Sequence, residues 1–185
     1  LAERHADLVA QRVGGVAFVA SSAGELMGAV RKVPGTEALM KGAMALSARV
    51  STPSRPLFLL RQSARGAFGK HPRRRDLNRA VLQAAQSDPR AVAALGRSIL
   101  QHHRYDALQA FRDIDVVVMA GSRDWLTSPR HAQRIGERLP ASTVVVFTDA
   151  GHFLPYERRE AVTTHLLGLT DKARRPVVET AGVAG

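Results

Sequence analysis

Three short runs of apolar residues recur along the chain without alternating with polar residues. They span Val16–Ala20, Val116–Ala120 and Thr143–Phe147, and Gly, Ser or Asp residues bound them. A continuous apolar run of this length is typical of a strand that is covered on both faces, as in a parallel sheet between layers of helices. The pattern therefore predicts three buried parallel strands.

Segments with apolar residues at helical spacing separate these runs. Asp88 followed by Pro89 has the order of an N-cap and a first helical residue, and Ser128 followed by Pro129 repeats it. Strands that alternate with helices favour an α/β fold, with a partial parallel sheet of about three strands. Helices are expected at Leu1–Val13, from Thr36 to about Val50, from Asp76, from Asp88 to Leu100, from Ser128 to about Leu139, and from about Arg158 to Leu167.

The stretch from about Gly24 to Arg112 differs from the rest, because it is rich in Ala, Leu and Arg and is broken by Pro and Gly. We interpret residues 24–112 as a helical lid inserted into a core of residues 1–23 and 113–170. Residues 171–185 are expected to form a flexible tail. The predicted sheet alone would expose an apolar edge, so we expect it to pair with a missing N-terminal segment or with a second copy.

The chain carries 27 Lys and Arg against 16 Asp and Glu, a formal net charge of +11. Such a charge attracts polyanions without making nucleic acid a specific ligand. A basic binding module stays open as an alternative, although no helix-turn-helix or aromatic platform supports it. The sequence has no cysteine, no apolar run of membrane-spanning length and no signal-peptide pattern. We therefore expect a cytoplasmic protein.

Asp124 and His152 each follow a predicted buried strand, Asp124 after Ala120 and His152 after Phe147. The carboxyl ends of parallel strands meet at one edge of a sheet, where functional groups collect. A carboxylate at this edge can accept the Nδ1 proton of an imidazole and stabilise the imidazolium that forms when the other nitrogen takes a proton. The spacing therefore predicts an acid–base pair.

The segments around both residues resemble the α/β-hydrolase superfamily. From Val116 to Pro129 the order is an apolar strand, Ala-Gly, two variable residues, Asp, and Pro before a helix. This order is similar to the strand and turn that present the acid of the family's catalytic triad. Ala150-Gly151-His152, followed by Pro155 and Glu157, resembles the family's histidine turn. The opening of the chain is similar to the segment that follows the family's nucleophile elbow.

The resemblance implies that Asp124 is the triad acid and His152 the general base. Trp125 and Phe153 would flank the pair, as substrate-binding walls or as packing. The implied activity is that of a serine-type hydrolase of small ester or acyl substrates, with no metal and no cofactor. On the same fold, a dehalogenase, an epoxide hydrolase or a cofactor-free oxidoreductase stays open.

The chain departs from the family at the nucleophile, because it contains no Gly-x-Ser-x-Gly. If the first helix is the end of the elbow helix, the nucleophile lies roughly two or three helical turns before Leu1. The oxyanion loop would also lie outside the chain. We therefore expect the 185 residues as given to be inactive, or to be a non-catalytic fragment.

Each candidate also has a plain structural interpretation. Asp124 could cap the helix after Pro129, and His152 could be a surface turn residue. Three further histidines, His102, His103 and His131, could suggest a metal site. No carboxylate falls at ligand spacing from them, so we interpret them as solvated helix residues.

Overall fold

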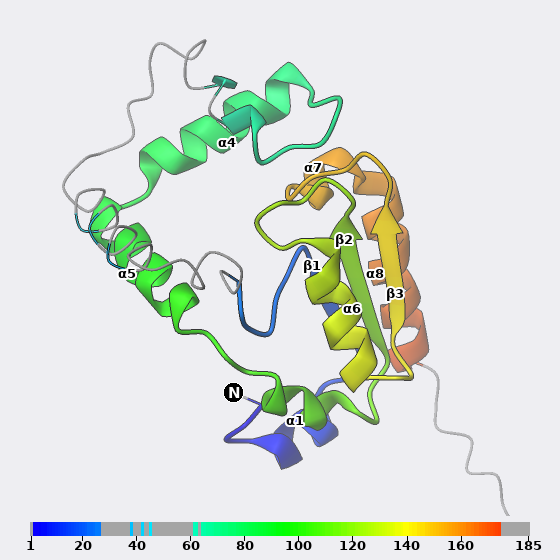
Figure 1. Ribbon diagram of the computed structural model, residues 1–185. Coiled ribbons are helices and arrows are strands. Elements are labelled where there is room, and N and C mark those ends of the chain that lie inside the picture. Colours follow the sequence, from blue (N-terminus) through cyan, green and yellow to red (C-terminus); the bar gives the residue numbers. More distant parts are fainter. Residues whose placement is uncertain are drawn as a thin grey trace, which may run out of the picture.

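Figure 1 shows the computed structural model of the chain. The structure describes residues 2–26, 61–62 and 64–174, together with the isolated positions 38, 42 and 45. The helix expected from Thr36 to about Val50 lies outside this description, apart from those isolated positions. The same holds for the expected tail beyond Arg174.

The described residues contain a parallel sheet of three strands in the order β1-β2-β3. The strands are β1 (Val16–Val19), β2 (Val116–Gly121) and β3 (Thr143–Phe147), which confirms the position of all three predicted strands. The predicted burial of all three is wrong, because β1 and β3 form the two edges of the described sheet: β1 is half-buried and β3 is largely exposed. In the central register, Val118 of β2 pairs with Phe18 of β1 and with Val144 of β3. All six positions of β2 are buried, as the unbroken apolar run predicts for a strand covered on both faces.

Helices lie on both faces of this sheet, with α6 on one face and α8 on the other (Figure 1). Alternate residues of β2 serve the two layers. Val116, Val118 and Ala120 join a core with residues of α6, whereas Val117 and Met119 join a core with residues of α8. The predicted α/β class, a partial parallel sheet with flanking helices, is therefore confirmed.

The predicted helices that the structure describes follow the expected order with shifted ends, and two short helices, at Asp106–Phe111 and Leu154–Glu157, were not predicted. Asp88 caps its helix as expected, because its carboxylate accepts hydrogen bonds from the backbone N–H groups of Arg90 and Ala91 at 2.7 and 3.3 Å. Between and beyond the strands lie α1 (Ala6–Arg12), α4 (Arg74–Gln86), α5 (Pro89–Leu100), the 3₁₀ helix η2 (Asp106–Phe111), α6 (Pro129–Arg138), α7 (Leu154–Glu157) and α8 (Arg159–Arg174).

Helix α8 continues past the predicted end at Leu167 to Arg174. Leu169 is buried against the sheet, and Lys172 Nζ lies 2.8 Å from the Asp115 carboxylate. These contacts hold the end of α8 in helical form, so the expectation of a flexible tail is wrong for residues 171–174. None of the helices among the described residues has the length and apolar character needed to cross a membrane.

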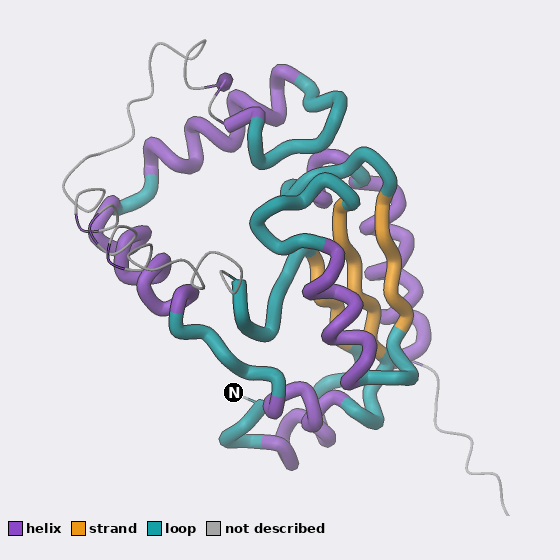
Figure 2. Tube along the Cα trace, viewed as in Figure 1, coloured by secondary structure: helices purple, strands orange, loops and turns teal. Residues whose placement is uncertain are grey.

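Helices α4 and α5 extend away from the sheet (Figure 2), within the segment interpreted as a lid. The start of that segment lies beside a part of the chain near its predicted end. Gly24 forms an antiparallel bridge with His103, and the Arg104 N–H donates to the Ala23 carbonyl at 2.6 Å. The chain therefore leaves β1 and returns to η2 through adjacent points, as an insertion requires. Its function as a lid stays a prediction.

Gly121, the last residue of β2, offers a test of how tightly the two turns beyond the sheet pack. A Cβ atom at Gly121 would lie 2.3 Å from the Gly151 carbonyl oxygen, whereas a Cβ at Gly168 of α8 meets nothing within 4 Å. We expect Gly121→Ala to lower the free energy of unfolding by about 1–3 kcal/mol, because backbone atoms must shift. Urea unfolding measures this difference.

Gly168→Ala is the matched control. It should raise the free energy of unfolding by roughly 0.5–1 kcal/mol, because Ala favours an exposed helix interior. A Gly121→Ala protein as stable as the wild type would contradict the packing of the two turns.

Candidate active site

Asp124 and His152 lie in the turns that follow the carboxyl ends of β2 and β3, as predicted. The structure fastens the two turns to each other. The Arg123 N–H donates to the Ala150 carbonyl at 2.9 Å, and the Asp149 N–H donates to Ser122 Oγ at 2.8 Å. The Arg123 side chain also pairs with the Asp149 carboxylate at 2.9 Å. Because these bonds tie the turns together, the two candidate side chains are held within reach of each other.

The carboxylate of Asp124 contacts the imidazole of His152 directly. Asp124 Oδ2 lies 2.9 Å from His152 Nδ1, and the Asp124 side chain is fully buried while that of His152 is 30% exposed. Within the part of the chain that the structure describes, no hydrogen bond reaches Nε2 of His152. The ring is therefore anchored through one nitrogen and leaves the other free for chemistry.

Three further donors hold the Asp124 carboxylate. Oδ1 accepts from the backbone N–H groups of Leu126 and Thr127, both at 2.9 Å, and Oδ2 accepts from Thr127 Oγ1 at 2.7 Å. Asp124 therefore also closes the local turn, so its plain structural interpretation and its pairing with His152 hold together. Thr127 was not among the predicted site residues, although a hydroxyl residue three positions after Asp is a recognisable turn signal.

These contacts set the charge of Asp124. Burial by itself raises the pKa of the carboxyl group, but hydrogen bonds from His152 and Thr127 favour the ionised form more strongly. The net pKa of Asp124 is therefore below its ordinary value. An ionised carboxylate beside Nδ1 is the arrangement that stabilises an imidazolium.

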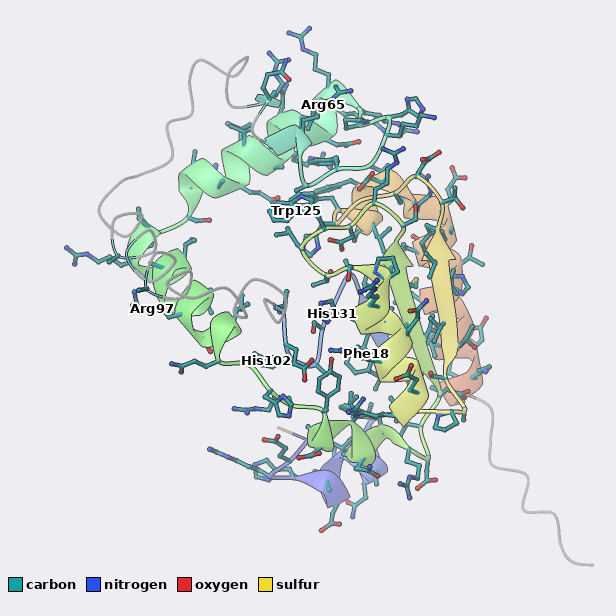
Figure 3. All side chains as sticks on the ribbon, viewed as in Figure 1. Phe18, Arg65, Arg97, His102, Trp125 and His131 are labelled. Atoms are coloured by element: carbon teal, nitrogen blue, oxygen red, sulfur yellow. The ribbon has the colours of Figure 1, made fainter. Side chains whose placement is uncertain are left out.

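Trp125 and Phe153, the two predicted wall residues, each follow one member of the pair. Trp125 is 65% exposed and projects toward the segment before α4, where its Nε1 donates to the Gly66 carbonyl at 2.7 Å (Figure 3). Phe153 is half-buried, with its ring stacked on Phe68 at a centroid distance of 4.5 Å. Trp125 thus presents an open aromatic surface, whereas Phe153 packs.

A segment far away in the sequence completes the surroundings of His152. The His152 N–H donates to the Ala67 carbonyl at 2.8 Å, and the Lys70 N–H donates to the Asp149 carbonyl at 3.0 Å. We call residues 66–70 the clamp segment. It contacts both the acid turn, through Trp125, and the histidine turn. Sequence periodicity gave no signal for this contact, which depends on the path of the inserted region.

The interpretation of His131 as a solvated residue is wrong. The residue is 8% exposed, and its Nδ1 lies 3.0 Å from Ser22 Oγ in the segment after β1 (Figure 3). Burial, followed by the charge of Arg134, lowers the pKa of His131. The ring faces inward because α6 packs closely against the sheet. Among the described residues, no group of three or more His, Asp or Glu is arranged to hold a metal ion.

The lowered pKa of Asp124 predicts a pH-dependent contribution to stability. That contribution is complete above the ordinary pKa of 3.8 and is lost as the pH falls through the lower folded-state value. The free energy of unfolding of the wild type should therefore exceed that of Asp124→Asn by a constant amount near neutral pH. This gap should narrow below about pH 4. Urea unfolding at stepped pH measures it.

Thr127→Val is the control for this experiment, because it removes one hydroxyl donor and keeps the carboxylate. In the Thr127→Val background, the same substitution of Asp124 should show a smaller change with pH. A gap that stays constant into the acid range would contradict a hydrogen-bonded, ionised Asp124.

The comparisons with known proteins bear on this arrangement. The family model described as the alpha/beta hydrolase fold matches residues 1–158. A search of curated protein sequences finds no match. The family match includes both turns and the clamp segment.

Solved structures show the same fold at low sequence identity. An esterase from Exiguobacterium antarcticum is 14% identical, with a TM-score of 0.66 over 92% of this chain and 63% of that one. An enol-lactonase from Burkholderia xenovorans is 15% identical, with a TM-score of 0.63 over 92% and 62%. An N-acyl homoserine lactone degrading enzyme is 21% identical, with a TM-score of 0.61 over 90% and 63%.

The chain thus spans less than two thirds of the length of these structures. At such identities the structural likeness establishes the fold and not the activity. The family match covers most of the sequence, and the parallel sheet with flanking helices agrees with it. The chain belongs to the α/β-hydrolase fold family.

Proposed function

We propose that the chain supplies the acid and the base of a serine-type hydrolase that acts on small ester or acyl substrates. The observation that carries the proposal is the contact between Asp124 Oδ2 and His152 Nδ1 at 2.9 Å. The buried, ionised carboxylate accepts a hydrogen bond from Nδ1–H and so keeps the neutral imidazole in the tautomer whose Nε2 carries a lone pair.

In the proposed reaction, Nε2 of His152 takes the proton from a serine hydroxyl as its oxygen attacks the acyl carbon. The imidazolium that results is stabilised by the charge of Asp124, and it then returns the proton to the leaving alcohol. A water molecule repeats the sequence to release the acid. Throughout, Thr127 Oγ1 holds Oδ2 of Asp124, so the carboxylate keeps its orientation.

The substrate class rests on the surroundings of the pair and on the similar structures. Trp125 gives the site an exposed aromatic surface, which suits an apolar acyl or alcohol group. An esterase and an enol-lactonase are among the similar structures, and esters and lactones share the same acyl–oxygen bond. This supports acyl transfer as the proposed chemistry. A protein described as a non-heme bromoperoxidase from Mycobacterium tuberculosis is also among the similar structures, so the oxidoreductase alternative stays open.

The nucleophile would come from outside these 185 residues, because the chain has no Gly-x-Ser-x-Gly. Ser22 is a poor substitute. The Ser22 hydroxyl donates to the Gly24 carbonyl at 2.6 Å, so its proton is already in a hydrogen bond. The histidine beside it is His131 and not His152. The coding sequence upstream of Leu1 decides the point. Gly-x-Ser-x-Gly supports the proposal, whereas Asp in place of Ser indicates a dehalogenase or an epoxide hydrolase.

Substitution of the pair tests the proposed roles in the polypeptide that carries this chain together with its upstream segment. We expect His152→Ala to lower kcat for a p-nitrophenyl ester by at least about 10⁴-fold, because no other group accepts the serine proton. Asp124→Asn should lower kcat by about 10³- to 10⁴-fold, because the wrong tautomer of His152 becomes favoured. Initial rates at saturating ester measure both.

His103→Ala is the matched control, since His103 is exposed and its bridge partner is Gly24, which belongs to neither turn. It should retain the wild-type rate. Full activity in His152→Ala would refute the proposed base. The 185-residue chain alone should give no turnover, and turnover that disappears in His152→Ala would contradict an external nucleophile.

A further inference from the structure

Glu157, at the end of α7, lies between the histidine turn and the clamp segment. Its Oε2 accepts from the Gly69 N–H at 2.7 Å. The Gly151 N–H donates to both carboxylate oxygens, at 3.0 and 3.1 Å. One carboxylate therefore joins the backbones of two segments that are far apart in the sequence, and one of them immediately precedes His152.

The two glycines approach each other so closely that neither has room for a side chain. A Cβ at Gly151 would lie 2.4 Å from the Phe68 carbonyl carbon and 2.5 Å from the Gly69 nitrogen. A Cβ at Gly69 would lie 2.0 Å from the Asp149 carbonyl oxygen. The N–H groups of Gly69 and Gly151, from two distant segments of the chain, thus point at the same place. An acceptor there needs more than one free lone pair.

An ionised carboxylate meets that requirement with two acceptor oxygens and a negative charge, whereas an amide can offer only one neutral oxygen. Ionised Glu presents two acceptor oxygens, whereas Gln presents one oxygen and an NH₂ group that would face a backbone N–H. Hydrogen bonds to an ionised acceptor are also the stronger kind. Glu157 accordingly does more than fill space between the segments.

Glu157 and the clamp segment hold the backbone before, at and after His152. Glu157 holds the N–H of the residue before it, and the clamp segment accepts the N–H of His152 itself through Ala67 at 2.8 Å. Phe68 adds a stacked contact with Phe153 directly after His152. With the backbone held in this way, the imidazole has little freedom to leave Asp124.

We propose that Glu157 is a positioning residue, which couples the clamp segment to the histidine turn and thereby fixes His152 against Asp124. This rests on the proposed function only for its effect on turnover. The coupling itself concerns the fold of the chain and is measurable without a substrate. A displacement of the clamp segment would then loosen the base, so the inserted region would control the acid–base pair through this carboxylate.

Hydrogen exchange of the backbone amides in the full chain tests the coupling. In the wild type, the Gly69 and Gly151 amides should be protected. In Glu157→Gln both should exchange about tenfold faster or more, because each loses a hydrogen bond to an ionised acceptor. Amides of β2 should keep their wild-type exchange rates. The Nδ1–H resonance of His152 should broaden as the ring loses its fixed place.

Glu160→Gln is the matched control, with the same chemical change at an exposed position near the start of α8. It should leave the Gly69 and Gly151 amides and the His152 resonance unchanged. Unchanged exchange in Glu157→Gln, or equally faster exchange throughout the chain, would overturn the coupling. If Glu157→Gln does not fold, the exchange rates of the wild type decide. Gly69 and Gly151 amides without protection in the wild type would then overturn the coupling.

Turnover gives a second and separate readout. In the polypeptide with its upstream segment, Glu157→Gln should lower kcat by about tenfold to 100-fold with KM unchanged, because a misplaced base acts only on the transition state. A change in KM alone would contradict a positioning role. Absence of turnover in the wild type would instead refute the proposed hydrolase and leave the exchange result to decide the coupling.

Discussion

The burial of β2 on both faces is the constraint on which the rest of the structure depends. Its alternate side chains enter two separate cores, one under α6 and one under α8. A strand with no polar face must be paired on both edges and covered on both sides, and β1 and β3 provide the two edges. Parallel pairing then brings the turns after β2 and β3 to the same end of the sheet. The acid–base pair is a consequence of that arrangement.

The pair is maintained by three segments and not by two. The acid turn contributes Asp124 with its own support from Thr127. The histidine turn contributes His152, and the clamp segment fixes the backbone of that turn. Apart from the stacked rings of Phe68 and Phe153, these supports are hydrogen bonds to backbone groups or to an ionised carboxylate. Such bonds are directional, so they fix the orientation of the imidazole as well as its distance.

The region interpreted as a lid therefore contacts the turn that carries His152, although the two are far apart in the sequence. Its first residue, Gly24, bridges to His103 near its predicted end, and its clamp segment lies against the histidine turn. A region of this kind can select substrates only through side chains that face the site. The proposed control of His152 needs only the contact of Glu157 with Gly69 and Gly151. Because the two effects depend on different residues, experiments can separate them.

The sequence by itself determined the positions of the strands and the proximity of Asp124 and His152. Uninterrupted apolar runs predicted β1, β2 and β3, although burial on both faces holds along the whole strand only for β2. Asp124 and His152 were predicted from their places just after two of these runs. These inferences succeed because each depends on local periodicity and on the general rule that parallel strands end together.

Only the tertiary structure decided the contacts that support the pair. His131 was expected in solvent, yet it is buried beside Ser22 because α6 packs against the sheet. Helix α8 extends to Arg174 because Leu169 finds a place under the sheet. The approach of Gly69 to Gly151 has no local signature, since the long stretch of chain between them leaves its path to long-range packing. Contacts between distant segments are set by the whole fold, and no window of sequence contains them.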